Sequence, residues 1–327
     1  MRVILWLVAL FAVLWGGFWY FGARTLRAET EAALTQMKAE GRVDYSAFDL
    51  GGFPARFDLS VTDPALADPG GRWRWRAPSL TVYALAYDPG KIIALLPSGQ
   101  TIETGGETIT LTTTDMRASA GFGLSTALPL LHAEAISDAT EAKSDLGWTL
   151  AAQQLRLAIR EEDAKSFRYR LGAEATALAL SGPPAEILAR ANLPASPGQA
   201  RIDADATFSR ALDRAAIDTP PMLRALALSA LELDWGDLSL RGDGRIDISA
   251  SGTPEGAINL RLRNWQGLPP LLVATGTVPP EMEKQLGDMM QQLAALSGDP
   301  AELALPLTFK AGWMALGPLP LGPAPRF

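Results

Sequence analysis

The sequence has no cysteine and a single histidine, His132, among its 327 residues. The absence of cysteine excludes disulfide frameworks, thiolate zinc sites, cysteine nucleophiles and iron–sulfur clusters. One imidazole is too few for metal sites built from several histidines. The 29 lysines and arginines are outnumbered by 36 aspartates and glutamates, a formal net charge of −7. A nucleic-acid partner is therefore not expected, because such proteins need a basic surface.

The short motifs of common catalytic sites are also missing. There is no G-x-S-x-G, no Walker A, no H-E-x-x-H, and no G-x-G-x-x-G that opens a helix after a strand. His132 has no serine with an elbow signature nearby, so it is interpreted as structural. Asp203 and Asp205 share one face of a predicted strand, and alternation with Ile202 and Ala204 favours solvated carboxylates over a metal or acid–base pair. We expect no enzyme, no catalytic residues, no metal site and no cofactor.

What the sequence does contain is an uncharged N-terminal run from Val3 to Phe21. As a helix rising ~1.5 Å per residue, these 19 residues extend ~28 Å, close to the ~30 Å hydrocarbon core of a bilayer. A cleaved signal peptide has a shorter apolar region and small residues before its cleavage site. Here the run exits through the bulky residues 18–21. The sequence therefore predicts an uncleaved transmembrane signal-anchor over residues 1–23.

Aromatic and basic side chains gather at the end of this segment, as they do at membrane interfaces. Arg2 with the N-terminal amine balances the two arginines beyond the segment, so charge gives no firm orientation. A two-residue tail is typical of an anchor whose N-terminus stays in the cytoplasm. We expect a single-pass protein of the bacterial inner membrane with its bulk in the periplasm. The interface candidates in this region are Trp15, Trp19, Tyr20, Arg24 and Arg27.

The remaining chain divides into a juxtamembrane helix at 24–41 and a β-rich domain at 42–327. Leu26, Ala33, Leu34 and Met37 recur at helical spacing, and from Arg42 the apolar residues alternate with period two. Helices are predicted over 184–191, 220–226 and 281–296. Strands are predicted over 43–50, 56–61, 73–77, 80–87, 102–104, 108–111, 149–160, 167–180, 200–208, 227–235, 238–240, 246–250 and 257–262.

The expected fold class is mainly β (α+β): an N-terminal transmembrane helix, then an elongated, twisted antiparallel sheet with a few covering helices. Asp243-Gly244 is interpreted as the two-residue turn of a hairpin. A Pro/Gly-rich seam at 194–199 leaves open whether the domain has one body or two related lobes. The proline-rich tail from Leu303 is expected to form a strand or two and then an extended segment, since interior prolines interrupt helices.

Arg72, Trp73, Arg74 and Trp75 form an alternating stretch that continues to Arg76. As a strand it places the tryptophans on one face and the arginines on the other. Two interpretations are open. Either tryptophan faces inward and arginine faces solvent, or the stretch is an amphipathic edge that rests on anionic lipid headgroups.

Several stretches together resemble domain-of-unknown-function family 2125, bacterial proteins with one N-terminal membrane segment. They are the tryptophan-rich anchor, Gly52–Leu59, Trp73–Tyr87 and Leu316–Pro325. The resemblance implies no activity and no site residues. More loosely, residues 235–256 are similar to AsmA- and TamB-like envelope proteins. That likeness implies an anchored periplasmic domain with a curved sheet and an apolar concave face for lipid.

Three functions follow as hypotheses. The first is a non-enzymatic envelope protein that binds or handles membrane lipid. The alternative is a scaffold or assembly factor whose partners are other envelope membrane proteins. A carboxylate enzyme is the third. An elongated apolar groove favours lipid handling, a filled core favours a scaffold, and a polar pocket with convergent acids favours an enzyme.

Overall fold

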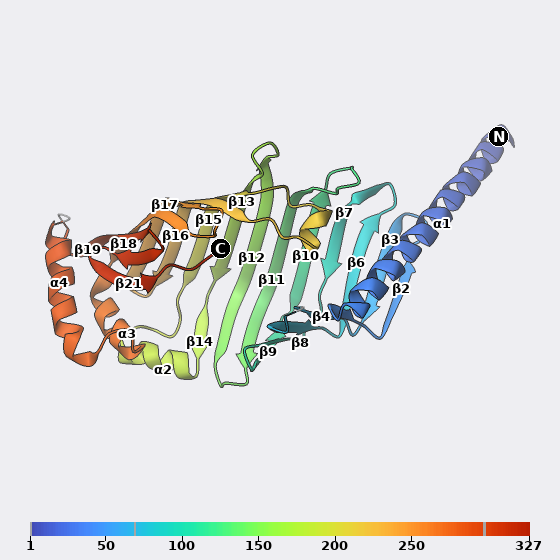
Figure 1. Ribbon diagram of the computed structural model, residues 1–327. Coiled ribbons are helices and arrows are strands. Elements are labelled where there is room, and N and C mark those ends of the chain that lie inside the picture. Colours follow the sequence, from blue (N-terminus) through green and yellow to red (C-terminus); the bar gives the residue numbers. More distant parts are fainter. Residues whose placement is uncertain (1, 69, 297–298) are drawn as a thin grey trace.

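The computed structural model describes residues 2–68, 70–296 and 299–327. Its first element is a long helix, α1 (Arg2–Ala39), which projects from one end of a twisted antiparallel sheet (Figure 1). This helix runs continuously across the predicted boundary between the segments 1–23 and 24–41 and ends at Ala39. Among the residues described, no helix is both long enough and apolar enough to cross a membrane.

The strands form one sheet that forks at its N-terminal end, and both branches pair with β11 (Leu130–Ser144). In spatial order, one branch is β2 (Ala47–Gly51), β3 (Arg56–Thr62), β6 (Ser79–Leu85), β7 (Asp88–Leu95) and β10 (Asp115–Phe122). The other branch is β1 (Val43–Asp44), β4 (Ala65–Ala67), β5 (Trp73–Arg76), β8 (Gln100–Thr104) and β9 (Glu107–Thr112).

Beyond β11 the sheet continues as a single antiparallel series to the C-terminus (Figure 1). Its order is β12 (Thr149–Asp163), β13 (Arg168–Thr176), β15 (Gln199–Phe208), β16 (Leu223–Trp235), β17 (Leu238–Ile248), β18 (Pro254–Arg263), β19 (Glu302–Lys310), β20 (Trp313–Leu316) and β21 (Leu319–Pro323). The short β14 (Ala179–Ser181) pairs with the start of β12. Because β13 pairs with β15, the sheet runs unbroken past residues 194–199.

The helices pack on one face of this sheet. Residues directly opposite each other in adjacent strands point to the same side. The register links Phe57 of β3, through Ala84, to Ile92 of β7, and Phe57 packs against α1. A parallel row ends at Leu305 of β19, which packs in one cluster with α3 (Leu268–Ala274) and α4 (Glu283–Leu296). We call this side the helix-bearing face.

The C-terminal end of the helix-bearing face is a filled core. Met290 and Ala294 of α4 and Leu303 of β19 are fully buried, and Leu262 and Leu305 nearly so. The helix predicted over 281–296 is confirmed as α4, which a short 3₁₀ turn (Pro280–Met282) precedes. The helix predicted at 184–191 is α2 (Pro183–Arg190), which packs on α3. The tail forms three strands, β19, β20 and β21, instead of the expected strand or two followed by an extended segment, and β21 occupies most of the part expected to be extended.

Two local predictions are wrong. Residues 220–226 are not a helix, because Leu223 and Ala225 alternate into the sheet and pair with β15. Asp243-Gly244 is not a turn, since both residues lie inside β17. The turn between β16 and β17 lies instead at Gly236, whose φ of 57° suits glycine.

Candidate ligand groove

Between the two helical ends, the helix-bearing face is open and forms an apolar groove of about 490 Å³. This volume lies within the ~300–1,000 Å³ typical of small-molecule sites. Six strands supply its walls and floor. The side chains on this face are Ile92, Ala94, Ala118, Ala120, Ala133, Ala135, Leu157, Ile159, Leu171, Ala173 and Ile202.

Alanine side chains form a low floor in the groove, whereas larger side chains occupy other parts of the same face. One register row runs Ala94, Ala118, Ala135, Leu157, Ala173 and Ile202 across β7, β10, β11, β12, β13 and β15. The same row continues through Leu231 of β16 and Leu260 of β18 to Leu305 under the helices. Small side chains in the centre leave space above the sheet, whereas leucines at the C-terminal end fill it.

Large apolar side chains at the groove remain in contact with solvent. Leu157 is 58% exposed and Ile202 is 43% exposed, although both lie on the side that is buried elsewhere. Fully burying a Leu or Ile side chain contributes about 1.5–3 kcal/mol. An apolar ligand that covered them would therefore gain favourable free energy, and contiguous exposed apolar surface of this kind marks binding sites.

A loop between β15 and β16, residues 209–222, joins the two sides of the groove. On one side, the backbone N–H of Leu212 donates to the buried Tyr169 hydroxyl (3.0 Å). The loop then reaches the β10–β11 connection, where the N–H of Arg214 donates to the Ala127 carbonyl (2.9 Å). We call residues 209–222 the strap.

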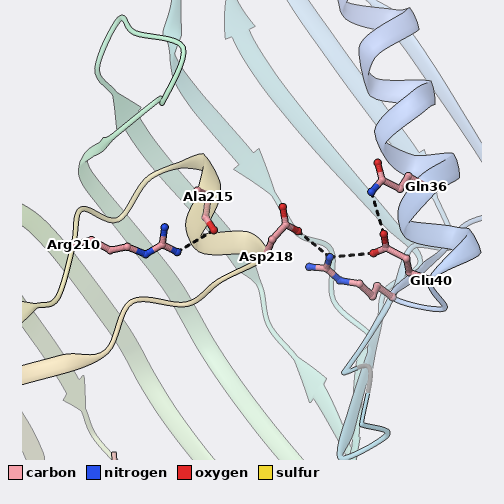
Figure 2. Close-up of polar contacts among 6 residues, drawn as sticks. Gln36, Glu40, Arg210, Ala215 and Asp218 are labelled. Carbon is pink, nitrogen blue, oxygen red and sulfur yellow. Dashed lines mark hydrogen bonds and ion pairs between the residues drawn. The ribbon is translucent and has the colours of Figure 1, made fainter. Parts of the chain in front are cut away.

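The far end of the strap meets the C-terminal end of α1. Arg42 donates to Asp218 of the strap (3.3 Å) and to Glu40 (3.2 Å), and Gln36 in turn donates to Glu40 (3.0 Å) (Figure 2). Asp218 and Glu40 are 77% and 41% exposed, whereas Arg42 is only 22% exposed. Ion pairs with exposed partners contribute only about 0–1 kcal/mol, so the pair of Arg42 with Asp218 is a weak contact between the strap and the end of α1.

The opposite face of the same strands carries charge. A hollow of about 590 Å³ is lined by four arginines and four carboxylates, so its lining has no net formal charge apart from His132. Arg170 donates twice to Asp203, at 3.0 and 2.8 Å. This hydrogen-bonded guanidinium holds the pKa of Asp203 below its ordinary value. Asp203 is thus part of an ion pair, and Ala204 and Ala206 occupy the buried face as predicted.

No group of three or more histidine, aspartate or glutamate side chains suited to a metal ion occurs within residues 2–68, 70–296 and 299–327. His132 lies on the charged face and packs directly on Gly121, where an added Cβ would collide with the imidazole. The arrangement supplies no convergent pair of unpaired acids at the groove.

The membrane-interface candidates on α1 divide into two sets. The indole N–H of Trp15 donates to the Pro54 carbonyl (2.9 Å), and that of Trp19 donates to the Arg56 carbonyl (2.7 Å). Gly22 brings the helix close enough for Phe57 to lie 3.3 Å from an added Cβ. These contacts dock α1 on the β2–β3 hairpin. In contrast, Tyr20 is 58% exposed, Arg24 is exposed, and Arg27 approaches Asp49 at 3.9 Å.

The second group of candidates lies elsewhere, on β5 and at the residue before it, in the other branch. Arg72 pairs with Asp68 (2.8 Å) and Arg74 is exposed. Trp75 faces inward and donates its indole N–H to the buried Gln100 (3.0 Å), while Trp73 stays 42% exposed. β5 is two strands from β1, which follows the C-terminal end of α1. Residues 22–39 separate that end from the apolar segment by about 27 Å of helix.

Together these features define a mainly β protein: one large antiparallel sheet with helices at both ends of one face and an open apolar groove between them. The chain belongs to the DUF2125 family, described as uncharacterized proteins conserved in bacteria, whose model matches residues 19–325. No curated protein matches the chain.

Proposed function

We propose that this protein is a non-enzymatic, membrane-anchored protein of the bacterial envelope that binds lipid in the groove. The observation that carries the proposal is the groove itself, an uncovered apolar stretch on a face that is filled at both ends. A lipid acyl chain has the chemistry to cover it. Acyl chains are apolar and need no hydrogen-bond partner, and they can lie in the space above a floor of alanine side chains.

The anchor in this proposal is the N-terminal part of α1. Val3 to Phe21 carry no charge, and several apolar side chains of this part of the helix are exposed. Leu10, Phe11, Val13 and Leu14 are between 56% and 70% exposed. Insertion into a bilayer removes that apolar surface from water. The proposal places residues 24–327 on the periplasmic side.

Lipid extraction followed by mass spectrometry on the purified full-length protein tests the groove. The test variant is Leu157→Glu, and the matched control is Ala158→Glu. These neighbours are both exposed and lie on opposite faces of β12. A charge on the groove face should expel an acyl chain, because burying a carboxylate in an apolar site is costly. We expect less co-purified lipid with Leu157→Glu and an unchanged amount with Ala158→Glu.

Two outcomes contradict the groove proposal. If the wild-type protein carries no lipid beyond that of the anchor, the groove is not a lipid site, and the scaffold function becomes the working hypothesis. If Leu157→Glu and Ala158→Glu retain equal lipid, the lipid lies elsewhere on the protein. Ile202→Glu provides a second groove variant on β15, in case Leu157→Glu alters the fold.

Orientation and anchoring are tested separately, using the absence of cysteine. A single cysteine at Leu146, an exposed position in the β11–β12 turn, should react with a membrane-impermeant maleimide applied outside the inner membrane. The protein should also stay with the membrane after alkaline extraction. Release by alkali would contradict the anchor, and protection of the cysteine would contradict the periplasmic placement.

A further inference from the structure

Three turns that are neighbours along one rim of the sheet each expose a large apolar side chain. Phe53 in the β2–β3 turn is 62% exposed, Tyr87 in the β6–β7 turn is 67% exposed, and Leu124 in the β10–β11 loop is 86% exposed. Leu124 is the most exposed large hydrophobic side chain among those described. We call Phe53, Tyr87 and Leu124 the apolar rim.

The three turns are contiguous. The N–H of Ala86 donates to the Ala55 carbonyl (2.9 Å), which joins the second turn to the first. A Cβ added to Gly90, at the start of β7, would lie 3.3 Å from the side chain of Leu124. The β10–β11 loop therefore lies against the start of β7, beside the β6–β7 turn. The apolar rim is therefore one surface, although its members come from three separate parts of the sequence.

The apolar rim lies beside the end of the uncharged segment of α1. The first turn accepts hydrogen bonds from Trp15 and Trp19, and the ring of Phe53 meets that of Trp19 edge-on with centroids 5.2 Å apart. Trp15 precedes Phe21 by six positions, about 9 Å along the helix. In Figure 1 the β2–β3, β6–β7 and β10–β11 connections all point to the side on which the N-terminal part of α1 extends.

We propose that the apolar rim is a second membrane contact, which inserts Phe53, Tyr87 and Leu124 into the surface of the bilayer that holds α1. The inference rests on the proposed anchor. If Val3–Phe21 lies in a bilayer, Phe53 lies at the depth of Trp15 and Trp19, and the neighbouring turns meet the same surface. Phenylalanine, tyrosine and leucine at turn tips suit this interface.

The apolar rim fixes the orientation of the domain. A single helix lets a domain rotate and tilt relative to the membrane, whereas a helix and two further contacts define a plane. Since the groove strands β7, β10 and β11 end at these same turns, that plane brings one end of the groove to the bilayer surface. An acyl chain could then pass between the membrane and the groove without crossing water.

The test uses the full-length chain with single cysteines labelled with bimane, in vesicles of phosphatidylethanolamine and phosphatidylglycerol. The labelled positions are Phe53→Cys, Tyr87→Cys and Leu124→Cys on the apolar rim. Leu14→Cys on α1 (64% exposed) reports the anchor, and Leu146→Cys (64% exposed), in the turn at the other end of β11, is the matched control. Brominated lipids quench a probe only where lipid reaches it.

We expect quenching at positions 14, 53, 87 and 124 and none at 146. If positions 87 and 124 are not quenched, like 146, while 14 is quenched, the proposed membrane contact of the apolar rim is wrong and the anchor is supported. Quenching at 53 does not change this conclusion, because 53 lies beside the helix. If 14 is not quenched, the anchor fails and the inference fails with it. Reaction of the unlabelled cysteines with a membrane-impermeant maleimide before and after detergent gives a second reading that does not depend on the probe. Position 124 should become reactive only after detergent.

Discussion

The centre and the C-terminal end of the helix-bearing face are built from the same pleated pattern and differ in what lies on top. At the C-terminal end, Leu303 and Leu305 lie under α4, and Met290 of that helix is fully buried. In the centre, Ala135 and Leu157 continue the same register row with no helix above them. The comparison shows that a continuous apolar face can be a core in one region and a ligand surface in another.

The largest expected effect comes from truncating the covered end. Met290→Ala should reduce the free energy of unfolding by about 2–5 kcal/mol, as buried large-to-small substitutions do. Leu157→Ala in the groove should change it by only about 0.5 kcal/mol, because that side chain is already exposed. Urea unfolding of the full-length protein in detergent, followed by circular dichroism of the sheet, measures both. Equal losses would erase the distinction between core and groove.

The second prediction concerns the contribution of the C-terminal strands to the core at the covered end. Leu319 of β21 and Leu316 of β20 pack against its core, and Gly317 between them lies directly on Leu305. Deleting residues 317–327 should therefore expose Leu319 and its partners and cost at least about 1.5–3 kcal/mol. A lowered melting temperature is expected. An unchanged value would mean that β21 contributes nothing to the core.

The third prediction concerns the charged face behind the groove. Because Arg170 lowers the folded-state pKa of Asp203, their pair stabilises the protein at a pH above the ordinary aspartate pKa. This contribution is lost as the pH falls through the folded-state value. Arg170 is 54% exposed, so Asp203→Asn should cost no more than about 1 kcal/mol. Melting temperatures of wild type and Asp203→Asn should differ at neutral pH and converge in acid; a constant difference would contradict the ion-pair account.

The smallest effect is expected at the strap. Asp218→Ala removes an exposed contact with Arg42 and should change stability by about 0–1 kcal/mol. It should nevertheless raise hydrogen–deuterium exchange in residues 209–216, because the strap loses its contact with Arg42 at the end of α1. Ala215 and Leu212 mark the segment to follow. Unchanged exchange would show that the contact between Asp218 and Arg42 does not hold the strap in place.

Much of the fold could be predicted from local patterns. The uncharged run predicted a helix that lies within α1, and the helical spacing of Leu286 and Met289 predicted α4. Alternation predicted the burial of Ala204 and Ala206 in β15 correctly, but Ile202, which was expected on the same buried face, is 43% exposed. The preference of proline for the first turn of a helix is misleading at Pro220-Pro221, where the prolines precede the strand β16. The sequence patterns do not indicate α3, a short helix whose stability depends on its packing against α2 and α4.

The groove itself could not be predicted from the sequence. Its floor is made of alanines from four strands, among them Ala94, Ala118, Ala135 and Ala173, and an isolated alanine in a strand carries no functional signal. Only the register brings them into one row. The fork at β11 is equally hidden, since β9 and β10 are adjacent in sequence yet both pair with the same strand. The apolar rim depends in the same way on three turns that meet only in the folded sheet.

The most direct test of the central claim is to map where an acyl chain lies on the full-length protein. A phospholipid with a photoactivatable diazirine in its acyl chain, added to the protein in vesicles, should give adducts on α1 and, separately, on groove-facing residues of β11, β12 and β13, including Ala135, Leu157 and Ala173. Leu157→Glu should remove the second set and spare the first. Adducts confined to α1 and the turn at Phe53 would contradict the groove as a lipid site.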